Sequence, residues 1–510
     1  MGMETVLPWL FILSRVLFIN PGDVFFDSKE YLMRWSNPSI WQALTTGHTP
    51  LHDGYVITFW PIYQFANIFT SIPAYVVMLS QVLLSLGTVI LFYKTTTLLF
   101  SKKLALKSAV VFSLLPLFWV TNVTVMMETT YLFYWIASIS FLVRYLKTDS
   151  RTIYLCLSSG FWLMAFLTHT VVLLWIPFVL YLGWMLNRKK FLRLMTAGLL
   201  TLVVASTINA YLLSASHGQS IGYGFVALFL SKFKEHASIT TDWLSLLRFL
   251  RNWIVPTFYN NNGLVVLLSI AGFFGVMKKN RQLAALFALW ILPTMITNQW
   301  WDSLFFGRHG LISTFAVAIL SVFLTKKLSL ILLVCYLGFG SLSALTLLNR
   351  DMPYRVVRKE LTGLNPGGFL IESHFARPQI NGEYAGEMFF VGEPGYDEKL
   401  LPMAINGYLS ANKPVYVTGQ ALSEPYGLFN GPYLHSLTLS YKEPFLLRDI
   451  LKGYTFSVQA APDWQNNLVI FSLSKARGEY PAIKYLVDSR RRMDKNDPIS
   501  RLTINLFTRR

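Results

Sequence analysis

The chain has 510 residues, of which 54% are hydrophobic and 14% are charged, and it carries a formal net charge of +18. A soluble domain has about 25% charged residues, so this composition excludes an ordinary soluble protein and indicates that lipid solvates much of the chain. The basic residues stand in short clusters between apolar runs, which is typical of a polytopic membrane protein and argues against nucleic acid as a partner. The two cysteines, Cys156 and Cys335, both lie in apolar runs, which excludes a disulfide framework or a zinc site built from cysteine.

The N-terminal stretch MGMETVLPWLFILSR has neither a basic region nor a small-residue cleavage site. It therefore predicts a first transmembrane helix rather than a signal peptide. Arg15 falls near the outer end of this helix. A cation in that place either snorkels to the lipid headgroups or serves a site, and we favour snorkelling.

Apolar segments long enough to cross a membrane, at roughly 20 residues each, recur along the first 350 residues. We expect about eleven spans, at 5–21, 73–98, 106–122, 129–147, 152–168, 170–186, 191–213, 262–278, 282–297, 310–325 and 328–347. The basic clusters between them are Lys102, Lys103 and Lys107; Arg144, Lys147 and Arg151; Arg188, Lys189, Lys190 and Arg193; Lys278, Lys279 and Arg281; and Lys326 with Lys327. With these spans every cluster lies on one side, which the positive-inside rule assigns to the cytoplasm.

Residues 55–70, YVITFWPIYQFANIFT, are apolar but short, and Pro61 is expected to interrupt them. Counting them as a full span would place all the basic clusters outside the cell. We therefore interpret this segment as an interfacial or re-entrant helix.

The outer loop at 22–72 is the stretch that we expect to carry the chemistry. It holds Asp27 and Glu30, which a helical turn would place on one face, and it is rich in aromatic residues. His48 and His52 bracket Pro50 in GHTPLHDGY. Histidines four residues apart on a helix would suggest metal ligands, but the proline argues against a helix there, so metal binding is the less favoured interpretation.

Further candidate residues fall on the same outer side. Glu128 stands where a helix is expected to begin in NVTVMMETTYLF, and His169 lies between two spans in FLTHTVVLLW. Arg308 opens a span in WWDSLFFGRHGLISTF. This arginine either anchors the helix at the interface or holds a phosphate, because its guanidinium matches phosphate oxygens.

The hydropathy changes after Leu348. Short β-like runs separated by Gly, Pro, Asn and Asp follow, namely GGFLIESH, EMFFVGE, KPVYVTG, FSVQA and LVIFSLS. They predict a soluble domain of mixed α/β or α+β character at 351–510, held outside the membrane, after a transmembrane module at 1–350. The basic tail from Arg490 is either a solvated terminus or lies against lipid headgroups.

These residues suit one reaction in particular. If the donor is a sugar on a polyprenyl phosphate, the leaving group is already a phosphate. The enzyme then needs a carboxylate to deprotonate an acceptor hydroxyl and cations to stabilise the departing phosphate. Asp27 would be the base, and Arg308, His48 or His52 would supply the positive charge.

The stretches FFDSKEYL, GHTPLHDGY, METTYLFYW and FGRHGLI follow one another in an order that resembles the GT-C glycosyltransferases, in particular the bacterial group related to protein O-mannosyltransferases and the lipid A aminoarabinose transferase. The resemblance implies an α-helical polytopic membrane protein with about 11–13 transmembrane helices and a C-terminal extracytoplasmic mixed α/β domain. It also implies an inverting transfer with Asp27 as base and Glu30 beside it as a second catalytic residue. His48, His52, Glu128, His169 and Arg308 would bind the donor phosphate or substrate.

The match departs from the family pattern at three points. Ser28 and Lys29 separate the two acidic residues that the family often has side by side, Thr49 stands where a proline is common, and His309 follows Arg308 where the family has tyrosine. The resemblance leaves a divalent cation open as a cofactor. It implies a multi-pass protein of the plasma (inner) membrane, with a polyprenyl-phosphate sugar as donor, a glycan, lipid or protein as acceptor, and membrane lipid as a further partner.

Two other classes of protein would explain part of the pattern. A transporter or flippase of a lipid-linked glycan would place ionisable residues at the bilayer midplane and show repeated halves, whereas these carboxylates fall at the outer boundary. A membrane-anchored binding protein would leave the common side of Asp27, Glu128 and Arg308 unexplained. We therefore favour the glycosyltransferase.

Overall fold

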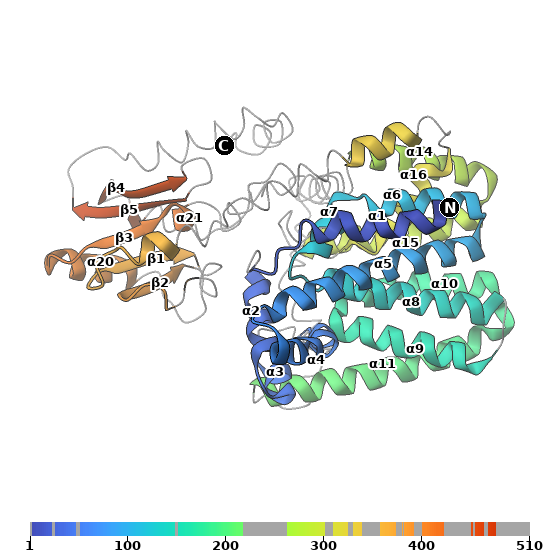
Figure 1. Ribbon diagram of the computed structural model, residues 1–510, viewed down its shortest axis with the longest axis horizontal. Helices are drawn as coiled ribbons and strands as arrows, with labels where there is room; N and C mark the ends of the chain where they lie inside the picture. Colours follow the sequence, from blue (N-terminus) through green and yellow to red (C-terminus); the bar gives the residue numbers. More distant parts are fainter. Residues whose placement is uncertain are drawn as a thin grey trace, which may run out of the picture. The chain divides into compact units, whose positions relative to one another are not determined.

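Figure 1 shows the computed structural model of the chain. The structure describes residues 3–22, 26–46, 52–147, 151–217, 263–300, 310–324, 330–338, 358–373, 380, 382–391, 400–422, 450–451, 454–463 and 468–475. The chain divides into two compact units, Met1–Trp301 with Phe306–Thr346 and Asp302–Phe305 with Leu347–Arg510.

The first unit is a bundle of helices. They are α1 (Met3–Val16), α2 (Phe26–Ser36), α3 (Ile40–Thr45), α4 (Asp53–Phe69), α5 (Pro73–Leu99), α6 (Lys102–Ser113), α7 (Pro116–Val123), α8 (Glu128–Lys147), α9 (Thr152–Thr168), the 3₁₀ turn η1 (Thr170–Trp175), α10 (Ile176–Leu186), α11 (Arg188–His217), α14 (Gly263–Lys279), α15 (Arg281–Trp300) and α16 (Ser313–Phe323). Their core is strongly aromatic: the Phe315 ring stacks on the Trp135 and Phe112 rings, with centroid distances of 5.7 and 4.5 Å.

With the exception of 106–122, the predicted spans from 73 to 213 correspond closely to the observed helices. By length and composition, two of the described helices can cross a membrane, Pro73–Leu99 and Arg188–Ser216, or three if a bent pair is one span. The bent pair is α6 with α7, which meet at 61° where a single span was predicted at 106–122. Pro116 at the first turn of α7 explains the break, because proline cannot continue the preceding helix but is well suited to begin the next. The total number of spans remains a prediction.

The expected interruption at Pro61 is wrong. Helix α4 continues through this proline from Asp53 to Phe69. Side chains next to Pro61 tie the helix to the end of α2: the Trp60 indole donates to the Asn37 carbonyl at 2.8 Å, and Gln64 donates to the Trp35 carbonyl at 2.7 Å. These tertiary hydrogen bonds hold the helix across the bond that proline lacks.

The expected snorkelling of Arg15 is also wrong, because its side chain is buried at 2% exposure. Its guanidinium lies 4.0 Å from the ring centroids of both Phe11 and Trp119. It also donates to the carbonyl of Ser113, the last residue of α6. Carbonyls at a helix end lack a partner within the helix, so Arg15 stabilises the break between α6 and α7 rather than reaching lipid.

The second unit contains a five-stranded sheet in the order β2-β1-β3-β5-β4. The strands are β1 (Phe369–Ser373), β2 (Glu387–Val391), β3 (Val415–Thr418), β4 (Tyr454–Asp463) and β5 (Leu468–Lys475), with helices α20 (Leu401–Ser410) and α21 (Gly419–Leu422). Strand β1 pairs in parallel with β2 and β3, while β5 pairs antiparallel with β3 and β4. All five predicted β-like runs form strands, and the predicted mixed character of this region is confirmed.

Candidate active site

Two loops lie side by side at the start of α2 and bring the outer carboxylates into one region. The Asn20 amide donates to the Val123 carbonyl at 2.8 Å, and the Ser28 hydroxyl donates to the Val125 carbonyl at 2.9 Å. Asp27, in the first turn of α2, is 6% exposed, and Glu128, which begins α8, is fully buried. Hydrogen bonds to the 123–125 backbone thus hold the N-terminus of α2 beside the turn that leads into Glu128.

Gln81 of α5 connects this turn to α4. Its buried amide donates to the carbonyls of Thr121 and Thr124, both at 2.8 Å, and its carbonyl oxygen accepts from the Tyr55 hydroxyl at 2.8 Å. Burial and the nearby Glu128 carboxylate raise the pKa of Tyr55 well above its ordinary value. Glu128 therefore lies within electrostatic range of α4 as well as beside the start of α2.

His52 and His169 form a pair although they are more than a hundred residues apart. Their ring centroids are 5.3 Å apart. The Nδ1 of His52 lies 3.0 Å from the Thr168 carbonyl, which can only accept, so this nitrogen carries a hydrogen. The Nδ1 of His169 accepts from the Val171 amide at 3.1 Å, so in the neutral ring Nε2 carries the hydrogen. The backbone thus selects opposite tautomers for the two rings.

A close approach of α4 to the end of α9 holds this pair in place. A Cβ atom on Gly54 would lie 2.3 Å from the Thr168 hydroxyl oxygen and 2.8 Å from the Met164 carbonyl oxygen, so only glycine fits here. His52, which precedes α4, adopts a left-handed backbone with φ of 49°, a conformation that costs about 1 kcal/mol for a side-chain-bearing residue. Its hydrogen bond to the Thr168 carbonyl helps to offset that cost.

Arg34 joins three elements and pairs with Asp53, the residue that follows His52. Its guanidinium lies 2.9 Å from the Asp53 carboxylate and donates to the Ala43 carbonyl at 2.7 Å. Glu30, one turn earlier on α2, lies 3.7 Å from the other end of the same guanidinium. The side chains of Arg34 and Asp53 are both 2% exposed. This buried network fixes α2 to α3 and to the start of α4.

The buried Asp53 predicts a pH-dependent stability. Burial raises its pKa from 3.8 to about 6, although the Arg34 guanidinium acts in the opposite direction. Between about pH 4 and pH 6 the folded protein thus holds a proton that the unfolded chain has lost, so this contribution to stability decreases as the pH rises through that window. A shift of this size corresponds to about 3 kcal/mol. We expect the difference in stability between wild type and Asp53→Asn to decrease by up to that amount between pH 4 and pH 7.

Thermal unfolding of both detergent-purified proteins across this pH range measures the effect. Glu360→Gln in the second unit is a matched carboxylate-to-amide control and should keep a constant difference from wild type. A pH-independent difference for Asp53→Asn would contradict the assignment of the raised pKa to this residue.

The described part of the chain thus brings together Asp27, Glu30, His52, Glu128 and His169 at one end of the helical unit. His48 and Arg308 lie outside the described residues. Among the described residues no three His, Cys, Asp or Glu side chains form a group that would hold a metal ion, so a divalent cation remains open. Arg34 and Gln81 were not expected as part of this region, whereas Asp53 was expected in the outer loop but without a role in the site. The spacing of Glu30 and Arg34, four residues apart on one helix, was a signal for the first of these.

Solved structures of GT-C enzymes share this fold. ArnT from Cupriavidus metallidurans, bound to undecaprenyl phosphate, is similar with a TM-score of 0.53 and 10% identity, over 93% of this chain and 98% of that one. An Archaeoglobus fulgidus oligosaccharyltransferase, in complex with Zn and sulfate, is similar with a TM-score of 0.53 and 11% identity, over 93% of this chain and 73% of that one.

Residues 53–211 match the sequence model of the dolichyl-phosphate-mannose-protein mannosyltransferase family. The chain is a membrane glycosyltransferase with the GT-C fold. No curated protein matches it. The matched segment of this glycosyltransferase begins at Asp53 and contains Glu128 and His169, while Asp27, Glu30 and His52 precede it. The predicted enzyme class and the resemblance to the GT-C enzymes are confirmed.

Proposed function

We propose that this glycosyltransferase moves a sugar from a polyprenyl-phosphate donor to an acceptor outside the cytoplasm, with inversion at the anomeric carbon and with Asp27 as general base. The observation that carries the proposal is the placement of Asp27 beside the Glu128 turn, at the same end of the helical unit as the His52–His169 pair. A polyprenyl phosphate is the ligand named for the ArnT structure that shares the fold.

The chemistry assigns one role to Asp27. Its carboxylate takes the proton from the acceptor hydroxyl as that oxygen attacks the anomeric carbon from the face opposite the phosphate. The bond between the anomeric carbon and the phosphate oxygen breaks, and its electron pair leaves with the polyprenyl phosphate. One displacement of this kind inverts the anomeric centre. Glu30, which forms an ion pair with Arg34, would support the start of α2 from which Asp27 acts.

The histidine pair suits the departing phosphate. The Val171 amide donates to the Nδ1 of His169, so in the neutral ring Nε2 carries the hydrogen and can act as a hydrogen-bond donor. His52, held through Nδ1, becomes a second donor when its Nε2 is protonated. Donors that are already oriented stabilise the charge that develops on a leaving group without further rearrangement. Glu128, an acceptor of hydrogen bonds, would bind a sugar or acceptor hydroxyl.

The position of the basic clusters supports a site outside the cytoplasm in a multi-pass protein. The Lys147 ammonium donates to the Leu98 carbonyl at 2.8 Å, and the Lys190 ammonium donates to the Tyr145 carbonyl at 2.7 Å, so three predicted loops with basic residues meet at one end of the bundle. Glu128 stands at the opposite end of α8, which at 20 residues is about 30 Å long. The positive-inside rule would place the basic end in the cytoplasm and the candidate site on the other side.

A panel of radiolabelled polyprenyl-phosphate sugars tests the proposal on the wild-type protein reconstituted in lipid. We expect one or a few donors to release polyprenyl phosphate when an acceptor mixture is present, and the product to have the opposite anomeric configuration from the donor. A product with retained configuration would contradict the single displacement. If no lipid-linked donor gave either release of polyprenyl phosphate or saturable binding, the proposed donor class would be contradicted.

A further inference from the structure

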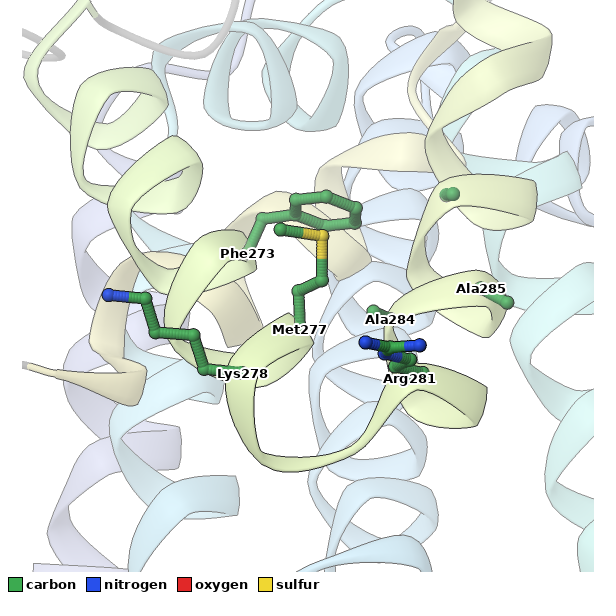
Figure 2. Close-up of a pocket in the computed structure, with 7 residues that line it drawn as sticks. Phe273, Met277, Lys278, Arg281, Ala284 and Ala285 are labelled. Carbon is green, nitrogen blue, oxygen red and sulfur yellow. The ribbon is translucent and has the colours of Figure 1, made fainter.

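A pocket of about 530 Å³ opens between α14 and α15, apart from the candidate active site. It is lined by Phe273, Met277, Lys278, Arg281, Ala284, Ala285 and Ala288. Figure 2 shows the Phe273 ring and the Met277 side chain in the space between the two helices, with the Arg281 guanidinium on the α15 side. The Lys278 side chain is exposed, and its ammonium points away from both Phe273 and Arg281.

The pocket exists because α14 packs closely on a different neighbour. A Cβ atom on Gly272 would lie 2.0 Å from the Leu320 carbonyl oxygen, so the backbone of α14 is pressed against α16. On its other side, α14 faces α15, which lines the pocket with Arg281 at its first turn and then with the small side chains of alanines 284, 285 and 288. The space that larger residues would fill is left open as an apolar groove.

The groove lies at the basic end of the bundle, far from the candidate active site. The ring of Phe287 in α15 stacks on the ring of Phe100, which follows the end of α5, with centroids 6.0 Å apart. Gln81, which contacts the candidate site, lies 19 residues before Phe100, a separation of about 28 Å along a helix. Arg281 precedes Phe287 by almost two turns.

We propose that this groove binds an anionic membrane phospholipid, with its phosphate at Arg281, where the nearby Lys278 adds positive charge, and an acyl chain along Phe273, Met277 and the alanines. Two features lead to this occupant. Among the described residues that line the pocket none is acidic, and their charged groups are two exposed cations near the turn between α14 and α15. Basic pockets between transmembrane helices at the cytoplasmic face suit anionic headgroups. The helices beside it also carry exposed apolar side chains, including Leu267 and Leu292, as a lipid-facing surface requires.

The test compares phospholipids retained by the full-length protein after incorporation into nanodiscs of equal parts phosphatidylglycerol and phosphatidylcholine, followed by native mass spectrometry. We expect selective retention of phosphatidylglycerol. Arg281→Gln combined with Lys278→Gln should weaken it at least ~10-fold, equivalent to about 1.4 kcal/mol. Ala288→Phe, which fills the groove and leaves the cations in place, should reduce retention as well.

The matched control is the variant with Lys102→Gln and Lys103→Gln. These changes remove two cations from another basic cluster, and neither residue lines this pocket. The control variant should retain the lipid as wild type does. Equal retention of both phospholipids, equal loss in the control, or unchanged retention in the groove variants would overturn the proposal. Displacement by inorganic phosphate alone would show a phosphate site, and displacement by polyprenyl phosphate would show a donor-lipid site; either would overturn it too. Thermal unfolding of each variant separates loss of binding from loss of folding.

Discussion

Asp27→Asn is expected to lower the turnover of the reconstituted enzyme by about 10²- to 10⁴-fold, the usual contribution of a general base. Asparagine keeps the size of the side chain and its place in the first turn of α2, but it cannot accept the proton of the acceptor hydroxyl. Donor binding should therefore persist. Release of polyprenyl phosphate at saturating donor measures the loss of turnover, and equilibrium binding of the same donor measures what is retained.

The matched control is Glu360→Gln, the same change of carboxylate to amide in the second unit, and it should keep wild-type turnover. The free energies of unfolding of the two variants should agree with that of wild type to within about 1 kcal/mol, since neither change creates a cavity. Turnover of Asp27→Asn within a few-fold of wild type, with the protein folded, would show that another group acts as base. Loss of donor binding instead of turnover would assign Asp27 to substrate binding.

Arg34→Met is expected to destabilise the protein by about 3–5 kcal/mol, the usual effect of removing one partner from a buried ion pair. The change leaves the buried Asp53 carboxylate without the guanidinium 2.9 Å away and leaves the Ala43 carbonyl without its donor. Because burial already raises the pKa of Asp53 to about 6, acidification below that value should protonate the carboxyl group and restore part of the lost stability. Thermal unfolding in detergent, at pH 5 and pH 8, follows both effects.

A double-mutant cycle with Asp53→Asn identifies the pair as the cause. In the variant that carries both changes the unpaired charge is gone, so the combined loss should be smaller than the sum of the two single losses by about 0.5–3 kcal/mol. Arg193→Met, on the exposed side of α11, is the matched control and should change stability by less than about 0.5 kcal/mol. Additive losses would mean that Arg34 acts mainly through the backbone carbonyls of α3.

The sequence predicted the candidate loops but not their internal connections. Asp27 and Glu30 lie on one helix as expected, and His169 lies between two helices as expected. Their neighbours were hidden because each depends on segments far apart in the chain. Gln81, in the middle of an apolar run, gave no local sign that it would bind the carbonyls of Thr121 and Thr124.

Two wrong expectations had the same origin. Arg15 and Pro61 were judged by what such residues do on an isolated helix in lipid, namely snorkel and break the helix. In the folded protein Arg15 finds two aromatic rings and a carbonyl at a helix end, and α4 is held across Pro61 by side-chain hydrogen bonds to α2. Neighbouring elements supplied partners that local rules do not include.

The sequence by itself determined the membrane class of this protein, the helices from 73 to 213 apart from the break between α6 and α7, and the five strands of the second unit. These features follow from hydropathy, periodicity and the positions of proline and glycine, which act over a few residues. The tertiary structure alone decided that His52 meets His169 with opposite tautomers, that Arg34 joins Glu30 to Asp53, and that a groove remains between α14 and α15. Each of these depends on which backbones approach one another, and a single sequence does not encode that approach in any local pattern.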